Sequence, residues 1–361
     1  MSLYDTYPIE GIEKRWSVPQ NFDATFDWEF DEGRKTLMHL YQKGKDMQWD
    51  AVNRIDWTLD LDFENPMQLP DEGNAIFGSP MWEKMTKKEK IEFRRHAQSW
   101  NISQFMQGEE AALICASKIV QQVPDLDAKF YGATQVMDEA RHVEAYTKLL
   151  QKFGVAYPMT EPLRILVDQA LRDSRWDMTY LAMQVVIEGL ALAAFGTIRD
   201  LSQNPLTRMV NAYVMEDEAR HVAFGRLSLR DFYPQLSQAE RDEREEFLVE
   251  ACYHMRNRFQ AREVYEVMGL PVEQCVEYAE QSEVNKMFRT LLFQRIVPVV
   301  KDIGLWGPKI QAAYADMGVL HYADQDLDEL ARNDEEIAKS IDENPMDIRT
   351  AYVHAVAGAA E

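Results

Sequence analysis

Apolar residues recur along most of this chain at spacings of three and four positions, which is the period of one buried face of an α-helix. No stretch alternates apolar and polar residues for long enough to predict a β-strand. Prolines and glycines divide the helical pattern into segments. The pattern predicts an all-α fold whose core consists of four long helices, at about residues 87–123, 126–153, 174–201 and 205–233.

The segments on either side of this core predict further helices. Their apolar spacing places them at about residues 32–52, 237–250, 272–303 (bent near Pro298) and 325–342. The remaining segments predict an arm packed on the bundle at 1–31, an irregular connection at 58–80, a crossover at Pro158 and Pro162, and a frayed tail over the last dozen residues. We expect one domain over residues 1–361, divided into an N-terminal arm and helix, a metal-binding four-helix core, and C-terminal accessory helices at 1–85, 86–232 and 233–361.

A five-residue stretch, Asp-Glu-Ala-Arg-His, occurs twice in the core segments, and Val follows both copies. Side chains three positions apart lie on the same edge of a helix, so Glu139 projects beside His142, and Glu218 projects beside His221. A single Glu-x-x-His pair often occurs by chance on the surface of a helix. Two identical copies on two helices predict half-sites for a pair of metal ions.

Two further acids, Glu109 and Glu188, each precede the Glu of one repeat by thirty residues. Each lies in the middle of an apolar stripe, while the neighbouring Glu110 lies off it. A buried carboxylate is costly unless it is neutralised or bound to a cation. A protonated or salt-bridged core glutamate would explain either acid alone, but the shared spacing favours metal binding. The predicted metal ligands are therefore Glu109, Glu139, His142, Glu188, Glu218 and His221.

One Glu from each of two helices plus Glu-x-x-His from each of two others is the ligand set of ferritin-like di-iron and di-manganese carboxylate bundles. The Gly108-Glu109 and Asp-Glu-x-Arg-His motifs resemble those of the O2-activating branch of that superfamily. The resemblance is to bacterial multicomponent monooxygenase hydroxylase subunits and ribonucleotide reductase small subunits in particular. The resemblance covers roughly residues 89–231. A fainter likeness to the monooxygenases lies in Gln48-Trp49-Asp50 and in Ile55-Asp56-Trp57.

The resemblance implies a ferritin-like bundle that holds two iron ions, with manganese or a mixed Mn/Fe pair as alternatives. Nitrogen and oxygen ligands without thiolate suit these metals, whereas zinc cannot pass electrons to O2. The resemblance also implies an O2-activating oxidase or oxygenase that works through a peroxo or high-valent intermediate on a small, apolar organic substrate. A reductase or ferredoxin would supply electrons, and the superfamily implies a homodimer.

Residues beside the ligands gain expected roles from the same resemblance. Asp138 would pair with His221 and Asp217 with His142, because a metal-bound imidazole usually donates its other N–H to an acid. Tyr146 stands one turn after His142, where the reductase small subunits place their radical tyrosine. An ordinary core tyrosine is the simpler explanation of that residue.

The two acids upstream of the repeats are expected to bridge the metals. Residues one turn away from them are then candidate walls of a substrate pocket: Phe105, Ala112, Leu192 and Phe195. The repeat arginines are expected to hold salt bridges within the bundle, and they are Arg141 and Arg220.

Two positions depart from the relatives. The monooxygenases carry a Thr one turn after the third-helix Glu, and Leu192 in its place weakens the case for the same hydroxylation machinery. The arylamine N-oxygenases carry a third His one turn before the last Glu, and Val214 in its place counts against them. An acyl-chain desaturase, a reductase-like radical-generating subunit, an iron-oxidising ferritin and a purely structural bundle stay open as alternatives.

Composition narrows the expected partners. The 361 residues carry a formal net charge of −22, which argues against nucleic acid because phosphate binding needs basic patches. Three cysteines without paired spacing argue against disulfides and rubredoxin-type iron sites. No signal peptide opens the chain and no apolar run reaches membrane-spanning length, so we expect a cytoplasmic protein without a membrane partner. The other five histidines, which include His354, lack companions at metal spacing, and the sequence does not identify the substrate.

Overall fold

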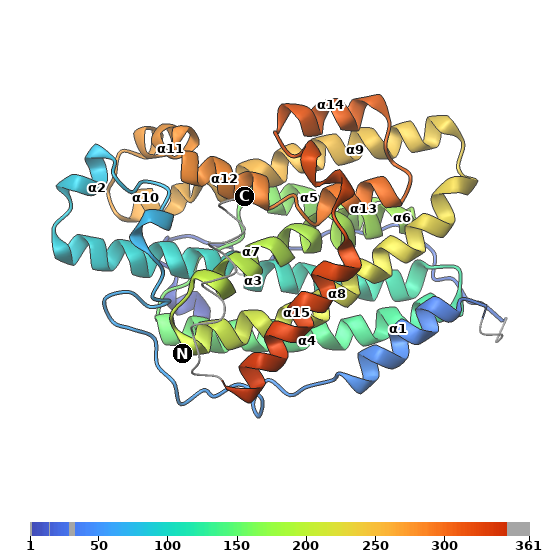
Figure 1. The fold of residues 1–361 in the computed structure, drawn as a ribbon, viewed down its shortest axis with the longest axis horizontal. Helices are drawn as coiled ribbons and strands as arrows, with labels where there is room; N and C mark the ends of the chain where they lie inside the picture. Colours follow the sequence, from blue (N-terminus) through green and yellow to red (C-terminus); the bar gives the residue numbers. More distant parts are fainter. Residues whose placement is uncertain (1, 14, 29–32, 345–361) are drawn as a thin grey trace.

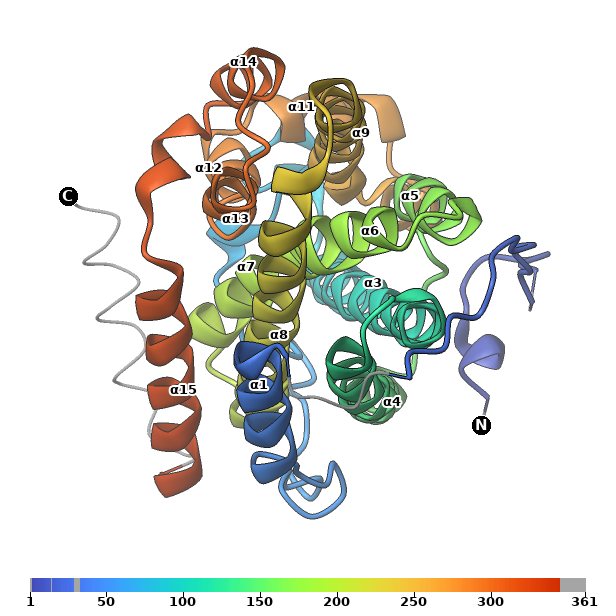
Figure 2. The same cartoon turned by 90° about the vertical axis from the view of Figure 1, so that its right-hand side faces the viewer.

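Four long helices lie side by side at the centre of the computed structural model, which describes residues 2–13, 15–28 and 33–344 (Figure 1 and Figure 2). The third of them has three consecutive parts. In chain order the core consists of α3 (Lys87–Gln122), α4 (Leu126–Phe153), the third helix with α6 (Trp176–Tyr180), a π-helical segment (Leu181–Ile187) and α7 (Glu188–Leu201), and finally α8 (Pro205–Phe232). The predicted four-helix core is confirmed.

Local sequence signals set the ends of these helices. The Thr86 hydroxyl accepts a hydrogen bond from the Glu89 N–H at the start of α3, and the Glu89 carboxylate accepts one from the Thr86 N–H at 2.8 Å. The Asp125 side chain accepts a bond of 2.8 Å from the Ala128 N–H at the start of α4. Gly154, with a φ of 67°, ends that helix. Because these signals are local, the predicted ends of α4 agree with the structure.

The third core helix contains an irregularity that the apolar pattern does not reveal. Its π-helical segment runs directly into Glu188, the first residue of α7. A π-helical turn contains more residues than an α-helical turn, so side chains after it are rotated relative to those before it. The helix Trp176–Leu201 is long and apolar enough to cross a membrane, but 83% of its most apolar window is buried inside the protein. Its apolar surface is that of a core helix.

Shorter helices surround this core. α1 (Lys35–Asp46) and α15 (Leu327–Glu343) both pack along α8 (Figure 2), and α9 (Gln238–Asn257) packs over the π-helical segment. The remaining helices are α2 (Pro80–Lys84), α5 (Glu161–Arg172), α10 (Arg262–Val267), α11 (Val272–Gln281), α12 (Glu283–Leu291), α13 (Ile296–Asp302) and α14 (Pro308–Asp316). In Figure 1, α9 to α14 lie above the bundle and cover one of its faces.

Several short helices differ from the prediction. The apolar pattern does not predict α5, α10 or α14. Pro162 breaks the pattern, yet it lies in the first turn of α5, where its missing N–H costs no hydrogen bond. The first predicted helix is shorter than expected, because α1 ends at Asp46. Pro298 lies in the first turn of α13 and does not bend the end of a helix as predicted.

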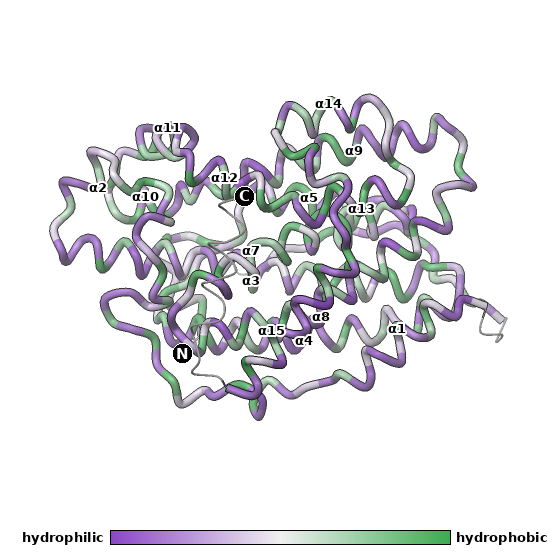
Figure 3. Tube along the Cα trace, viewed as in Figure 1, coloured by the Kyte–Doolittle hydropathy of each residue, from purple (hydrophilic) through white to green (hydrophobic). Residues whose placement is uncertain are grey.

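The fold class agrees with the prediction. No strand occurs in residues 2–13, 15–28 and 33–344, and hydrophilic and hydrophobic stretches alternate along the helices (Figure 3). Leu3, Tyr7 and Trp16 of the N-terminal arm are partly buried against the core, as an arm packed on the bundle requires. The expected frayed tail, together with His354, lies outside the described residues.

A close approach at Gly225 of α8 allows a test of the packing around the third core helix. A Cβ at this position would stand less than 3.0 Å from the Gln184 side chain in the π-helical segment. We therefore expect Gly225→Ala to lower the free energy of unfolding by about 1–3 kcal/mol, as overpacking does. Gly196→Ala in α7 is the matched control, because its Cβ would meet Met215 at an ordinary 3.4 Å. Chemical denaturation measures both variants, and equal losses of stability would contradict this packing.

Candidate metal centre

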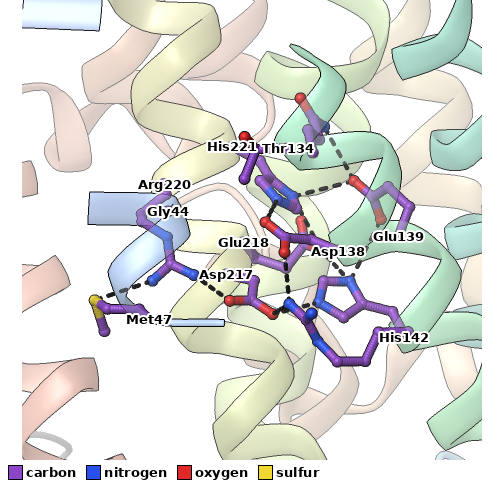
Figure 4. A network of polar contacts seen from close by, with 12 residues as sticks. Gly44, Met47, Thr134, Asp138, Glu139, His142, Asp217, Glu218, Arg220 and His221 are labelled. Carbon is purple, nitrogen blue, oxygen red and sulfur yellow. Dashed lines mark hydrogen bonds and ion pairs between the residues drawn. The ribbon is translucent and has the colours of Figure 1, made fainter. Parts of the chain in front are cut away.

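All six predicted metal ligands project into the middle of the four-helix core, where each is at most 4% exposed. α3 supplies Glu109, α4 supplies Glu139 and His142, α7 supplies Glu188, and α8 supplies Glu218 and His221. Their ligand atoms form two groups within which all atoms lie within 4.8 Å of one another, namely Glu109, Glu139, His142 and Glu218, and Glu139, Glu188, Glu218 and His221. The two copies of the sequence repeat thus face each other as halves of one site (Figure 4).

Two carboxylates, Glu139 and Glu218, belong to both groups. Nδ1 of His142 lies 3.4 Å from a Glu139 oxygen and 3.0 Å from a Glu218 oxygen. Nδ1 of His221 lies 3.1 Å and 3.4 Å from oxygens of the same two acids. The grouping favours these two acids as the bridging ligands instead of the predicted Glu109 and Glu188, because each of the latter belongs to one group only. The repeat glutamates hold the position between the two groups.

The donor atoms of this cluster fit cations. Glu139 Oε2, Glu188 Oε2, both carboxylate oxygens of Glu218 and Nδ1 of His221 are buried without a hydrogen bond of good geometry, although most of them lie 3.0–3.4 Å from another member of the cluster. Buried polar atoms are normally hydrogen-bonded, and unpaired ones are costly. Four carboxylates and two imidazoles balance two divalent ions in charge, and such oxygen and nitrogen donors suit iron or manganese. The role of the six residues as ligands stays a prediction, and their unpaired atoms agree with it.

Burial and mutual contact determine where protons lie in this cluster. Burial, reinforced by the charge of Glu218, raises the pKa of Glu109 and of Glu188 well above its usual value. Burial alone would lower the pKa of His142, but its hydrogen bonds to Asp217 and to the surrounding glutamates raise it well above its usual value. Protons therefore favour Glu109, Glu188 and His142, and metal binding at these groups must displace them.

Two aspartates hold the imidazoles from behind. Nε2 of His142 lies 3.0 Å from Asp217 Oδ2, and Nε2 of His221 lies 3.2 Å from Asp138 Oδ2, as the sequence predicts. Arg141 donates to both aspartates, at 2.5 Å to Asp138 and 2.7 Å to Asp217. These contacts turn Nδ1 of each ring toward the glutamates.

The predicted salt bridges of the repeat arginines are also present. Arg220 donates to Asp217 and, at 2.7 Å, to the Glu216 carbonyl, while Nη1 of its guanidinium lies 3.5 Å from the sulfur of Met47 (Figure 4). Arg141, the equivalent arginine of the first repeat, connects both halves of the site by donating to Asp138 and Asp217. Neither arginine is among the residues that line the cavity beside the ligands.

Several residues that sequence reasoning missed complete this network. The Gln135 amide donates to Glu139 at 3.0 Å and to Glu188 at 2.8 Å, so it holds acids from two helices. Its position four residues before Glu139, on the same face of α4, was the available signal. Gln48 donates to Asp138 at 2.7 Å and Trp49 donates to Asp217 at 2.8 Å. This segment is far from the ligands in sequence, so the only signal that pointed to it was its faint likeness to the monooxygenases.

A small cavity of about 20 Å³ lies directly beside the cluster. Its acidic side is formed by Glu109, Glu188 and Glu218, and the rest is mostly apolar. The other lining residues are Gln104, Phe105, Gly108, Ala112, Ile187, Leu190, Ala191, Phe195, Arg258 and Phe259. Three of the four predicted wall residues are therefore present. Leu192 is not, since α7 turns Ala191 toward the cavity.

Tyr146 lies next to this cavity as part of an aromatic group. Its hydroxyl donates to Asn211 at 3.1 Å, and its ring centre lies 5.9 Å from that of Phe105 and 5.7 Å from that of Phe195. Burial, together with the charge of Glu109, raises the pKa of the Tyr146 hydroxyl well above its usual value. The environment is that of a core tyrosine with a satisfied hydroxyl, and a radical role stays a prediction.

Comparison with models of known protein families identifies the family of this chain. Residues 31–304 match the model of the family described as p-aminobenzoate N-oxygenase AurF, which is well over half of the chain. The chain belongs to the AurF family. Membership in this oxygenase family confirms the predicted class, an O2-activating di-iron oxygenase or oxidase, and hence an oxidoreductase.

Solved structures with a similar fold include R2-like ligand-binding oxidases. A mutant of that oxidase with an anaerobically reconstituted Mn/Fe cofactor is 16% identical to this chain, with a TM-score of 0.49, and the match covers 78% of this chain and 96% of that one. The oxidase with an aerobically reconstituted Mn/Fe cofactor is 17% identical, with a TM-score of 0.37, covering 90% and 95%. A search of curated proteins finds no match.

The argument from Val214 against kinship with the arylamine N-oxygenases is therefore wrong. The family match extends over residues 31–304 and depends on the whole pattern, whereas the argument used a single position. Val214 is fully buried in α8, one turn before Glu218. An apolar side chain at this position is therefore compatible with membership in the family.

The adjacent acids Glu109 and Glu110 provide a matched pair for testing metal binding. Glu109 is buried in the cluster, whereas Glu110 on the next position of α3 is exposed. We expect Glu109→Gln to weaken Fe(II) binding at least about tenfold, since loss of even an outer partner of a ligand has that effect. Glu110→Gln should bind Fe(II) as the unmodified protein does. Anaerobic calorimetric titration measures both, and indistinguishable binding by the two variants would contradict the assignment.

Proposed function

We propose that this chain is a di-iron oxygenase that oxidises a small aromatic substrate in the cavity beside Glu109, Glu188 and Glu218. The supporting observation is the position of that cavity: its acidic side consists of proposed metal ligands, and its other walls are largely apolar. Small-molecule sites are typically apolar with a few placed polar groups. The proposal assigns all six clustered residues as ligands of two iron ions, with manganese or a Mn/Fe pair as the alternative.

The chain's own residues prepare this site for redox chemistry. Two bound iron ions would supply the binding and reduction of O2. The glutamates neutralise the ions, Asp138 and Asp217 fix the imidazoles, and Gln135 fixes Glu139 and Glu188. Because every one of these groups is buried, bulk water is kept from the reacting atoms.

The cavity walls favour an aromatic ring. Phe105 and Phe195 pack edge to face with ring centres 4.6 Å apart, an arrangement that a third ring can extend. A Cβ built on Gly108 would meet nothing within 4 Å, so this glycine leaves open space on α3 next to Glu109. A volume of about 20 Å³ holds one water molecule, so a substrate enters only when the walls move apart.

An aromatic amine is the first candidate substrate, because the matching family is named for an enzyme that acts on p-aminobenzoate. Oxidation of an aromatic carbon is the second candidate. It is favoured by Val214, which stands where the arylamine N-oxygenases resembled by this chain carry a histidine. Both reactions use the same cavity and the same two metals, and they differ only in the product.

The remaining expectations belong to this proposal. A reductase or ferredoxin would deliver two electrons for each O2, and the net charge of −22 would attract a donor with a basic docking surface. We also propose that the chain forms a single domain, that it works as a homodimer in the cytoplasm, and that it needs neither nucleic acid nor a membrane.

A single-turnover experiment tests the proposed reaction. Fe(II)-loaded protein, mixed with p-aminobenzoate and isotopically labelled O2, should convert the amine to a hydroxylamine that carries one labelled oxygen. The di-ferrous centre supplies two electrons, solvent supplies two protons, and the second oxygen atom leaves as water, so the reaction balances. Mass spectrometry identifies the product, and label on a ring carbon would establish the second candidate.

Two controls make this outcome decisive. Glu109→Gln should give no labelled product, whereas Glu110→Gln should give as much as the unmodified protein, since only the first acid lies in the cluster. Oxidation of Fe(II) by O2 without label in p-aminobenzoate, aniline or benzoate would contradict an oxygenase that acts on small aromatic substrates.

A further inference from the structure

Arg258 is a buried cation in the wall of the cavity beside the metal cluster. It is 5% exposed and begins the short 3₁₀ turn Arg258–Gln260 that follows α9. It lines the same cavity as the cluster acids Glu109, Glu188 and Glu218. A substrate in that cavity would therefore contact both the metal side and a guanidinium group.

The guanidinium of Arg258 has no carboxylate partner among the described residues. Nη2 lies at the limit of hydrogen bonding, 3.5 Å from the Gln104 carbonyl, Nη1 lies 3.8 Å from the Met255 sulfur, and Nε has no partner. The ring of the neighbouring Phe259 lies 5.0 Å from the guanidinium carbon. These neutral contacts leave most of the five N–H donors unused.

Several other buried arginines of this protein are paired with acids. Arg244 donates to both carboxylate oxygens of Asp177, at 3.0 Å and 3.3 Å. Arg295 donates to Asp334 at 2.7 Å. A buried unpaired charge is strongly unfavourable, so the fold normally supplies a partner, as it does at these two sites. Arg258 differs from them in that it has no acidic partner among residues 2–13, 15–28 and 33–344 and borders a cavity.

The charge of Arg258 persists in spite of its burial. Burial lowers the pKa of its guanidinium to about 10, and the side chain is still positively charged near neutral pH. The cluster acids cannot neutralise it once the metals are bound, because two divalent ions already balance the four carboxylates. The loaded site would then hold one uncompensated positive charge.

The backbone that carries Arg258 adopts an unfavourable conformation. Phe259 departs from helical geometry, with φ −93° and ψ 34°, and Ala261 has a φ of 51°, in the left-handed region that favours glycine. Such conformations persist where surrounding structure enforces them, and they are frequent at ligand sites. This turn directs both Arg258 and Phe259 to the cavity wall.

We propose that Arg258 binds a carboxylate group of the substrate and thereby fixes the end of the molecule that does not react. The planar guanidinium can donate two parallel hydrogen bonds to one carboxylate, while Phe259, Phe105 and Phe195 contact the apolar body. This inference rests on the proposed function, since it concerns the same cavity. It assigns to Arg258 the discrimination between aromatic substrates with and without a carboxylate group.

Binding of benzoate and benzamide to iron-loaded protein under anaerobic conditions tests this proposal. The two probes have nearly the same shape, but only benzoate carries a carboxylate. Calorimetric titration should show that Arg258→Gln weakens benzoate binding at least about tenfold, the effect of losing charged hydrogen bonds, and leaves benzamide binding unchanged. Arg256→Gln is the matched control, because it removes one positive charge from the same end of α9 without reaching the cavity.

Further measurements separate a binding role from a structural one. Arg258→Gln should keep or raise the melting temperature, because it removes an unpaired buried charge, whereas a structural arginine would lower it. Arg258→Lys should recover only part of the benzoate affinity, since an ammonium lacks the guanidinium fork. Benzoate that binds Arg258→Gln as tightly as it binds the unmodified protein, for instance through the metals alone, would overturn the proposal.

Failure of this inference is distinct from failure of the proposed function. Selective loss of benzoate binding in Arg258→Gln would stand even if no oxygenated product forms, since binding is measured without O2. Conversely, labelled product with unchanged benzoate binding would support the oxygenase and refute the role of Arg258. No binding of benzoate to the unmodified protein would also refute it.

Discussion

Four carboxylates and two imidazoles lie within a few ångströms of one another at the centre of an apolar bundle, and this charge density is the constraint on which the rest of the structure depends. Burial of such a group is strongly unfavourable unless cations neutralise it. The surrounding hydrogen-bond network is arranged as a site for cations requires. Asp138 and Asp217 each bind the back of one imidazole, Arg141 binds both aspartates, and Gln135 binds two of the acids. Several of the atoms that face inward have no hydrogen-bond partner.

The same constraint accounts for the architecture around the site. Each of the two groups of ligands draws on three of the core helices, so the full cluster forms only when all four are packed together. The π-helical segment Leu181–Ile187 rotates the start of α7, where Glu188 lies, relative to the preceding helix. Gly225 permits the close contact between α8 and that segment at Gln184, whose amide in turn donates to Gln135.

Much of this could be predicted from the sequence because the signals were local or repeated. Asp125 and Gly154 set the ends of α4, and the repeated Glu-x-x-His pairs identified the cluster. Features that depend on three-dimensional packing could not be predicted. Examples are the π-helical segment, the position of the repeat glutamates between the two groups of ligands, and Arg258, which sequence spacing does not distinguish from the arginines that are paired with acids.

The central claim is that this cluster holds two metal ions between the four core helices. Anomalous X-ray diffraction at the iron absorption edge, from crystals of the Fe(II)-loaded protein, tests it most directly. The account predicts two peaks, one among Glu109, Glu139, His142 and Glu218 and the other among Glu139, Glu188, Glu218 and His221. A single peak in the cluster, or iron bound only elsewhere on the protein, would contradict it.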